Sequence, residues 1–344
     1  MTRQVKPMLA KLVAEIPPGL YYEPKWDGFR AIVVRDGGEI EILSRNGKPM
    51  ARYFPDLVAA FATLPERCVV DGEIVVIAAS GRLDFFALQQ RVHPAASRVD
   101  RLAAETPATF IAFDLPDLPR PFRERRAALE AMAWSPPLHL TPVTRDEGVA
   151  REWFERFEGA GLDGVIAKDG DLPYLPGKRA MLKIKHQRTL DCVVAGYRLH
   201  KTADDAIGSL LLGLYDDGGG RSWAGAFGGL VPIGATASFA LARRRDLLTE
   251  LAPLRIERAQ HPWGEAMHAE RDGNRWNPAR ERKFVALSPE RVMEVRYDHM
   301  DGGFLRHPAT FVRWRPDRDA ESCDFGQLEQ PVALDVRAAL RAAP

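Results

Sequence analysis

The chain is built from short apolar runs separated by turn-forming residues, and the pattern of these runs changes once along the sequence. In the first half, runs of strand length alternate with helical stretches, which predicts a mixed α+β domain. After the basic run KRAMLKIKHQR (178–188), alternating strands are broken by glycine clusters, a spacing that fits a small β-barrel. The expected strands are 31–34, 39–43, 68–77, 109–115, 191–199, 209–227 and 292–300, and the expected helices are 83–92, 122–132, 149–160 and 239–251.

Size and composition exclude several classes of protein. A length of 344 residues suggests two domains. No apolar run approaches the ~20 residues that a membrane span needs, and the N-terminus lacks a signal sequence, so we expect a cytoplasmic protein without membrane contact. The formal net charge of +1 excludes a chain that coats nucleic acid over its whole surface. Any site for a polyanion must therefore be a local cluster.

The first candidate for chemistry is Lys25, in the segment EPKWDGFR (23–30). Pro24 fixes its own φ and biases Glu23 away from helix, so we expect Lys25 at the rigid end of a strand. A lysine beside a turn is also common on protein surfaces. This segment alone therefore does not identify a site.

Three later segments place charged side chains together on strands. Two carboxylates lie two residues apart in VVDGEIVV (69–76), and two lysines do so in MLKIKH (181–186), so each pair shares one strand face. GLDGVIAK (161–168) sets a carboxylate at a turn and a lysine on the strand that follows. The residues are Asp71, Glu73, Asp163, Lys168, Lys183 and Lys185. Singly they could be turn formers or a solvated strand face, but their coincidence in one chain favours a reactive site.

In this order the segments resemble the motifs of the covalent nucleotidyltransferases, the superfamily of ATP-dependent DNA ligases, RNA ligases and mRNA capping enzymes. Lys25 matches the KxDGxR nucleotide-attachment motif. The remaining matches are SRNG (44–47) with SRxG, VVDGE (69–73) with the DGE motif, FDL (113–115) with the aromatic motif, GLDGVIAK (161–168) with EGxxxK, LKIK (182–185) with KxK, and FVRWRPDR (311–318) with RxDK. The resemblance covers essentially the whole chain, whose length is similar to that of the short bacterial C-type (LigC-like) ligases.

The resemblance implies both a fold and an activity. The fold is an α+β nucleotidyltransferase domain, the ATP-grasp-like DNA ligase core, over residues 1–187, followed by an all-β OB-fold domain over 188–344. The activity is that of an ATP-dependent DNA ligase that requires Mg²⁺ or Mn²⁺. Lys25 would become adenylated, AMP would pass to the 5′ phosphate of a break, and the 3′ hydroxyl would then seal it.

The resemblance also implies roles around the nucleotide. Lys25 would attack the α-phosphorus of ATP, which an amine does in its neutral form, and neighbouring cations favour that form. Glu73 and Asp163 would hold the metal through hard oxygen ligands. Glu73 would also bond the ribose, and Phe113, which in isolation fits a core aromatic, would stack on adenine. The full set of expected nucleotide-binding residues is Glu23, Arg30, Glu73, Phe113, Lys168, Lys183 and Lys185.

Other roles concern DNA and pyrophosphate. Arg45 would hold the 5′ phosphate of the break, and Asp317 and Arg318 would act on pyrophosphate during adenylation, unless 311–318 is only a solvated turn. Asp163 stands where the family has glutamate and Arg318 where it has lysine. Both departures keep the charge. The shorter Asp163 is expected to reach the metal through water, and Arg318 to grip pyrophosphate as a fork.

We expect a monomer that binds nicked or broken double-stranded DNA and acts in repair. Some two dozen residues precede Lys25, so the helical DNA-binding domain of larger ligases is not expected, and DNA affinity would come from the two core domains or from a repair polymerase or end-binding protein.

One alternative is an RNA-joining or capping-type enzyme of the same superfamily. Another is a non-catalytic OB-fold that binds single strands through aromatics and basic grooves. An intact Lys25 with all its partners argues against the second.

Overall fold

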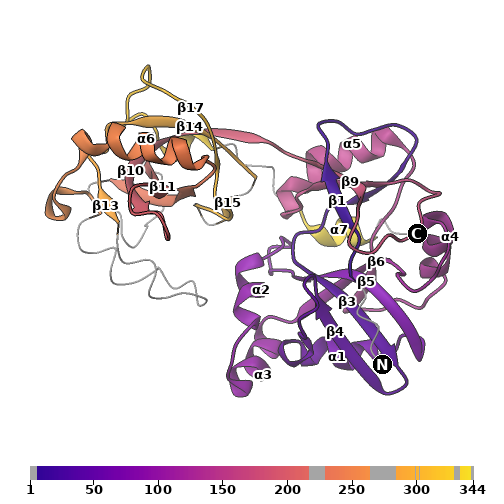
Figure 1. The fold of residues 1–344 in the computed structure, drawn as a ribbon. Helices are drawn as coiled ribbons and strands as arrows, with labels where there is room; N and C mark the ends of the chain where they lie inside the picture. The colour runs from indigo at the N-terminus through magenta and orange to yellow at the C-terminus, as the bar shows by residue number, and fades with distance from the viewer. Residues whose placement is uncertain are drawn as a thin grey trace. The chain divides into compact units, whose positions relative to one another are not determined.

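The computed structural model describes residues 6–216, 229–263, 284–298, 300–301, 303–328 and 334–341. The chain divides into two compact units (Figure 1). The first unit combines residues 1–186 with 330–344, and the second contains 187–329. The mixed α and β content expected from the sequence is confirmed.

A five-stranded sheet runs through the first unit in the order β4-β3-β5-β6-β7. Its strands are β3 (Phe29–Asp36), β4 (Glu39–Ser44), β5 (Arg67–Val76), β6 (Ala108–Asp114) and β7 (Leu138–Leu140). Neighbours are antiparallel except for the parallel pair β6 and β7. Strands β3 and β4 form the hairpin expected around Asp36-Gly37-Gly38, and the φ of +62° at Gly37 is one that a tight turn requires.

A second sheet of the first unit has the order β1-β9-β8-β2. Its strands are β1 (Leu9–Leu12), β2 (Tyr21–Pro24), β8 (Gly164–Lys168) and β9 (Arg179–Lys185). Strand β8 pairs antiparallel with both β2 and β9, while β1 runs parallel to β9. The segments that hold the candidate lysines and Asp163 are therefore neighbours in one sheet.

Five α-helices accompany these sheets in the described part of residues 6–186. They are α1 (Pro55–Phe61), α2 (Phe85–Arg91), α3 (Ala96–Glu105), α4 (Phe122–Glu130) and α5 (Glu147–Arg156). The helix expected at 149–160 begins earlier because the Asp146 carboxylate caps the N–H groups of Gly148 and Val149. Its last residues form a 3₁₀ turn that ends at Gly161, in the left-handed conformation. Short 3₁₀ turns are also found at Ala51–Tyr53, Ala252–Leu254, Arg258–Gln260 and Phe325–Gln327.

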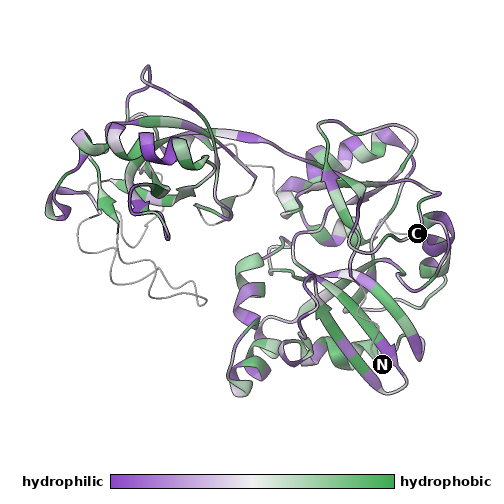
Figure 2. Cartoon of the chain, in the orientation of Figure 1, coloured by the Kyte–Doolittle hydropathy of each residue, from purple (hydrophilic) through white to green (hydrophobic). Residues whose placement is uncertain are grey.

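The first unit buries two apolar clusters. One contains Phe54, Phe61 and Phe110, where helix α1 packs on the five-stranded sheet. The other joins the two sheets, since it contains Tyr22 of β2 and Ile111 of β6. Figure 2 shows the apolar residues concentrated in the strands and hydrophilic residues along helices such as α4. These cores fix the relative positions of the strand ends that carry the site.

The second unit is an antiparallel sheet with the order β12-β11-β10-β14-β17. The strands are β10 (Arg188–Leu199), β11 (Ile207–Tyr215), β12 (Leu230–Thr236), β14 (Val292–Tyr297) and β17 (Thr310–Trp314), with β13 (Val285–Ala286) added to β10. A bridge between Thr236 and Ala309 brings β12 beside the start of β17. The expected helix is α6 (Leu241–Glu250), and β15 (Met300–Asp301) pairs with β16 (Phe304–Leu305). Part of the strand region expected at 209–227 lies outside the described residues.

The C-terminal segment corrects the expected assignment of all residues after 187 to one domain. Helix α7 (Val336–Arg341) belongs to the first unit, where the side chains of Val336 and Ala339 are buried. The Val336 N–H donates to the Gly81 carbonyl at 2.7 Å. Burial of an apolar helix face thus ties this segment to the first unit. Across the described residues, every helix is too short or too polar to cross a membrane.

Candidate active site

Lys25 lies directly after β2 and is clamped by the turn before β8. Its N–H donates to the Gly164 carbonyl at 2.8 Å, and its own carbonyl accepts from the Asp163 N–H at 3.0 Å. Its ammonium nitrogen lies 2.6 Å from Asp163 Oδ2. Gly164 has a φ of +131°, and a Cβ there would lie 2.1 Å from the Ile184 carbonyl, so the glycine is required for this close approach. The expected place of Lys25 at a rigid strand end is confirmed.

Asp163 joins two of the candidate lysines. Lys185 of β9 lies 3.0 Å from the same Asp163 Oδ2 that binds Lys25. Burial opposes ionisation of Asp163, but the charges of Lys25 and Lys185 outweigh it and hold the pKa of this carboxyl well below its ordinary value. Lys183, two residues before Lys185, shares its strand face and pairs with Ile166 of β8. The charged form of this carboxyl is therefore favoured by the two lysines that contact it.

Glu73 faces the same region from β5. Its Oε1 accepts a hydrogen bond from the Gly28 N–H at 3.2 Å, and Glu73 pairs with Arg30 in the register of β3 and β5. Burial raises the pKa of Glu73 to about 7, although the positive charges of Arg30 and Lys25 oppose the shift. The ionised form of this carboxyl therefore lowers the stability of the folded protein, and such perturbed pKa values are common at functional sites.

Glu73→Gln is expected to stabilise the metal-free protein at pH 8. A carboxyl whose pKa is raised in the folded state does not destabilise the protein at a pH below its ordinary pKa of 4.5. The destabilisation grows as the pH rises from there to the folded-state pKa of about 7. After an allowance for partial exposure, the gain in the free energy of unfolding should be about 1–2 kcal/mol at pH 8 and close to zero at pH 4.5. Urea unfolding in the presence of EDTA measures both, with Glu41→Gln, at an exposed position of β4, as the control. Equal stability of Glu73→Gln and wild type at pH 8 would contradict the raised pKa.

Arg30 is held by a buried chain of polar contacts. Its guanidinium binds both oxygens of Asp71, at 2.5 and 2.6 Å, and Asp71 is fully buried. The Tyr174 hydroxyl donates to Asp71 Oδ2 at 2.6 Å and accepts from the Met8 N–H at 3.0 Å. The sequence did not single out Tyr174, which lies in the segment between β8 and β9. Its hydroxyl fixes the carboxylate that in turn fixes Arg30.

Phe113 and Arg30 are in contact. The Arg30 guanidinium lies 4.4 Å from the centroid of the Phe113 ring, a cation–π arrangement. Phe113 is nearly buried, at 7% exposure. The structure thus brings the expected aromatic residue to the site, and the expected stack of adenine on Phe113 stays a prediction.

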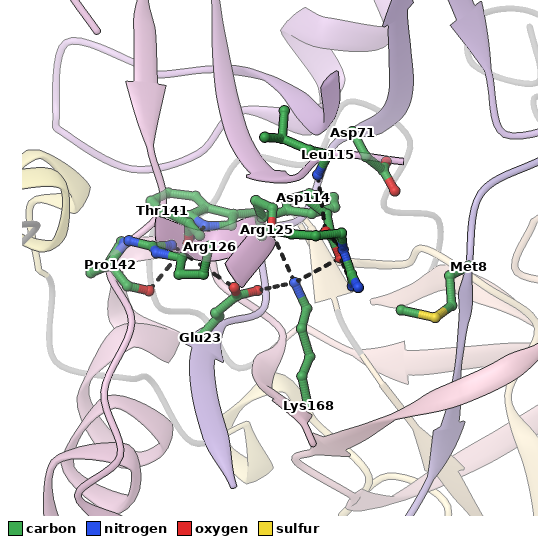
Figure 3. A network of polar contacts seen from close by, with 12 residues as sticks. Met8, Glu23, Asp71, Asp114, Leu115, Arg125, Arg126, Thr141, Pro142 and Lys168 are labelled. Carbon is green, nitrogen blue, oxygen red and sulfur yellow. Dashed lines mark hydrogen bonds and ion pairs between the residues drawn. The ribbon is translucent and has the colours of Figure 1, made fainter. Parts of the chain in front are cut away.

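A buried ionic network surrounds Glu23 and Lys168 (Figure 3). Lys168 Nζ lies 2.8 Å from Glu23 Oε2 and donates to the Phe113 carbonyl at 3.1 Å. Arg126 of α4 approaches the other oxygen of Glu23, Oε1, at 4.0 Å. Burial raises the pKa of Glu23 despite these two cations. Nearby, Arg125 pairs with Asp114 through two hydrogen bonds of 2.7 and 3.1 Å.

This network leaves polar atoms without hydrogen-bond partners. They are Glu23 Oε1 and the two terminal nitrogens of Arg126, and both side chains are at least 97% buried. Unpaired polar atoms in a buried position are costly unless a ligand or water satisfies them. Arg126 was not predicted from the sequence, because α4 carries many arginines and its pattern does not show which one turns inward.

Three expected residues lie elsewhere. Arg45 is exposed in the turn after β4. Asp317 and Arg318 belong to the second unit, in the turn after β17, where Asp317 pairs with Arg315 at 2.9 Å. Hydrogen bonding from Arg315 lowers the pKa of Asp317. The structure therefore brings together residues of the first unit that are expected at the nucleotide, and it leaves these three as separate predictions.

The assembled residues can support attack by an amine on a phosphorus. Asp163 holds Lys25 at the end of β2, and Lys185 contacts the same carboxylate. Buried polar atoms of Glu23 and Arg126 in the same unit lack hydrogen-bond partners. In the described ranges, no three metal-ligating side chains converge. A metal held here would take only Glu73 and Asp163 from the protein, with phosphate and water as its other ligands, which suits Mg²⁺.

Comparison with known proteins defines the class. The family model described as "ATP dependent DNA ligase domain" matches residues 4–185, and "ATP dependent DNA ligase C terminal region" matches 203–318. The chain is 58% identical to DNA ligase C2 of Mycolicibacterium smegmatis, with 95% of each chain covered. It is 54% identical to DNA ligase C of Mycobacterium tuberculosis, with 96% of each covered. A solved structure of a Lig E DNA ligase shares the fold, with a TM-score of 0.57 at 19% identity over 90% of this chain and 99% of that one.

The chain therefore belongs to the ATP-dependent DNA ligase family. Within that family it is a short ligase similar to those named DNA ligase C. The resemblance read from the sequence motifs is confirmed.

Proposed function

We propose that this ATP-dependent DNA ligase joins 5′-phosphate and 3′-hydroxyl ends of DNA through AMP bound covalently to Lys25. The observation that carries the proposal is the 2.6 Å contact of Lys25 Nζ with Asp163, inside a cluster that includes Lys185. In the first step the Lys25 amine forms a bond to the α-phosphorus of ATP, the bond from that phosphorus to the α–β bridging oxygen breaks, pyrophosphate leaves with the electron pair, and the amine releases its proton to the departing pyrophosphate or to solvent. Because Asp163 stays ionised, it orients the amine and is not suited to accept its proton.

The buried network supplies the base pocket in this proposal. Glu23 Oε1 is an acceptor without a hydrogen-bond partner, which suits an amino group such as that of adenine. Lys168 holds the other oxygen of Glu23 and approaches Phe113. Arg30 and Glu73, paired across β3 and β5, would contact the ribose and phosphates. Lys183 and Lys185 would neutralise the phosphate charge, which is the main contribution of a protein to phosphoryl transfer.

Mg²⁺ fits the oxygen donors of the site. The positive charge of Lys25 favours the ionised form of both Glu73 and Asp163. A bound Mg²⁺ would replace part of this favourable interaction with Lys25. Such a metal would supply charge neutralisation at the phosphate oxygens. Asp163 must then exchange one of its lysine partners for the metal or for a metal-bound water.

The second unit fits an OB-fold. The order of its five main strands, the bridge from Thr236 to Ala309 and the place of α6 between β12 and β14 support a barrel with one helix. We assign Asp317 and Arg318 of this unit to the adenylation step, at the pyrophosphate. Action on nicked or broken double-stranded DNA, a role in repair and a partner polymerase or end-binding protein stay predictions.

Arg45→Ala is expected to spare adenylation of the enzyme and to slow AMP transfer to DNA by about 10-fold or more, because a lost phosphate contact affects only the complex that contains DNA. Single-turnover assays with a nicked duplex measure the two steps separately. Arg67→Ala, which removes an 88% exposed arginine at the other end of the same sheet, is the matched control. Equal loss in both steps would place Arg45 at ATP instead.

Mass spectrometry of the purified protein tests the proposed function. After incubation with Mg²⁺ and ATP, we expect one added AMP on Lys25, and after incubation with GTP, no adduct. The adenylated protein should then seal a nicked DNA duplex in the absence of ATP. A GMP adduct would indicate a capping-type enzyme, sealing confined to RNA would indicate an RNA ligase, and a protein without any adduct would favour a binding module.

A further inference from the structure

Asp191 is the side chain that connects the first strand of the second unit to the turn at 315–318. It lies on β10, and its side chain is 12% exposed. One terminal nitrogen of Arg315 donates to both oxygens of Asp191, at 3.0 and 2.8 Å. The Arg318 Nε lies 3.8 Å from Asp191 Oδ2. A single carboxylate thus contacts two arginines of this turn.

Arg315, which is held by Asp191, also binds Asp317. Its Nε and its second terminal nitrogen donate to the Asp317 carboxylate at 3.0 and 2.9 Å, so one guanidinium bridges two carboxylates. The side chain of Asp317 is 62% exposed, compared with 12% for Asp191. An exposed ion pair alone orders its partners weakly. The better-buried Asp191 is therefore the anchor of the arrangement.

The backbone around Asp191 is itself fixed. Asp191 pairs with Glu294 in the register of β10 and β14, and its carbonyl accepts from the Gln327 side chain at 3.3 Å. The turn is attached to the same sheet, because the Arg315 N–H donates to the Val292 carbonyl at 3.0 Å. Both ends of the contact thus belong to one rigid sheet.

We propose that Asp191 is a positioning residue for the adenylation step, which holds Arg315 and through it Asp317 and Arg318 in the geometry that meets pyrophosphate. The inference rests on the proposed function of Asp317 and Arg318. Asp191 touches no reacting atom in this proposal, since Arg315 occupies both its oxygens. Its contribution is preorganisation of the turn, and small displacements of such groups reduce rates strongly.

Asp191→Asn tests the proposal, because it keeps the size of the side chain and removes its charge. We expect adenylation at saturating ATP to slow by about 10- to 100-fold, while sealing of a pre-adenylated nick changes less than about twofold. Asp191→Glu should recover part of the adenylation rate. Asp205→Asn, which breaks the exposed 2.7 Å pair with Arg245 in the same unit, is the matched control and should leave both steps unchanged.

Several outcomes overturn the proposal. Wild-type adenylation by Asp191→Asn, or an equal fall of both reactions, would show that Asp191 only supports the barrel. If Asp191→Asn does not fold, Arg315→Lys keeps the charge but cannot bridge two carboxylates, and it must show the same loss confined to adenylation. A wild-type protein that takes up no AMP would instead contradict the proposed function, so the two failures are distinguishable.

Discussion

Lys25→Ala is expected to abolish adenylation of the protein and sealing of an ordinary nick, with no AMP adduct detectable by mass spectrometry. The reason is chemical, since the Lys25 amine is the proposed nucleophile, held 2.6 Å from Asp163 and fixed by two backbone hydrogen bonds to residues 163 and 164. Sealing of a pre-adenylated nick should persist at least in part, because that step needs no lysine nucleophile.

Lys11→Ala, at an exposed position of β1, is the control for loss of a lysine from the same sheet and should behave as wild type in both assays. Thermal unfolding excludes a trivial loss of structure in Lys25→Ala. A Lys25→Ala protein that still carries AMP would contradict the assignment of the nucleophile. Lys185, which also contacts Asp163, would then be the next candidate.

The double substitution Asp317→Ala with Arg318→Ala is expected to slow adenylation from ATP by about 10²-fold or more. A charge-assisted contact to a developing leaving group contributes a few kcal/mol to the transition state, and this contact is lost. Sealing of a pre-adenylated nick should stay near the wild-type rate, because pyrophosphate has already left before that step.

The matched control is Asp205→Ala with Arg245→Ala, which removes an ion pair of the same composition from another part of the second unit. Both steps should be unaffected in that variant. If adenylation and sealing fall together in Asp317→Ala with Arg318→Ala, the turn at 315–318 supports the fold of the second unit and has no specific role with pyrophosphate.

Much of the fold could be predicted because its signals are local. Apolar runs and the turn at Gly37 predict β3, β4, β5 and β6, and Pro24 predicts the strand end before Lys25. Helices α1 and α3 were not predicted. Neither has a side-chain cap, and each buries only two side chains, whereas α2, which also has seven residues, begins after the capping Asp84.

The site was predictable only where residue types form recognisable segments. Lys25 and Asp163 are 138 residues apart, and it was the order of the motifs that placed them together. Tyr174, Arg126 and Asp191 carry no such pattern. Their contacts depend on which residues the strand register and the inner face of α4 bring together, and no local sequence feature determines that.

The position of helix α7 has a consequence for biosynthesis. The first unit contains residues from both ends of the chain, so Val336 is translated 150 residues after His186. At about 5–20 residues per second, a ribosome needs roughly 8–30 s for that stretch. During this interval the Gly81 carbonyl lacks its hydrogen bond from Val336 and the apolar surface beneath α7 is uncovered, although all the described strands of the first unit have already been made. The nascent first unit is therefore most open to aggregation and to chaperones while the second unit is being synthesised, and its core closes only after α7 has been made.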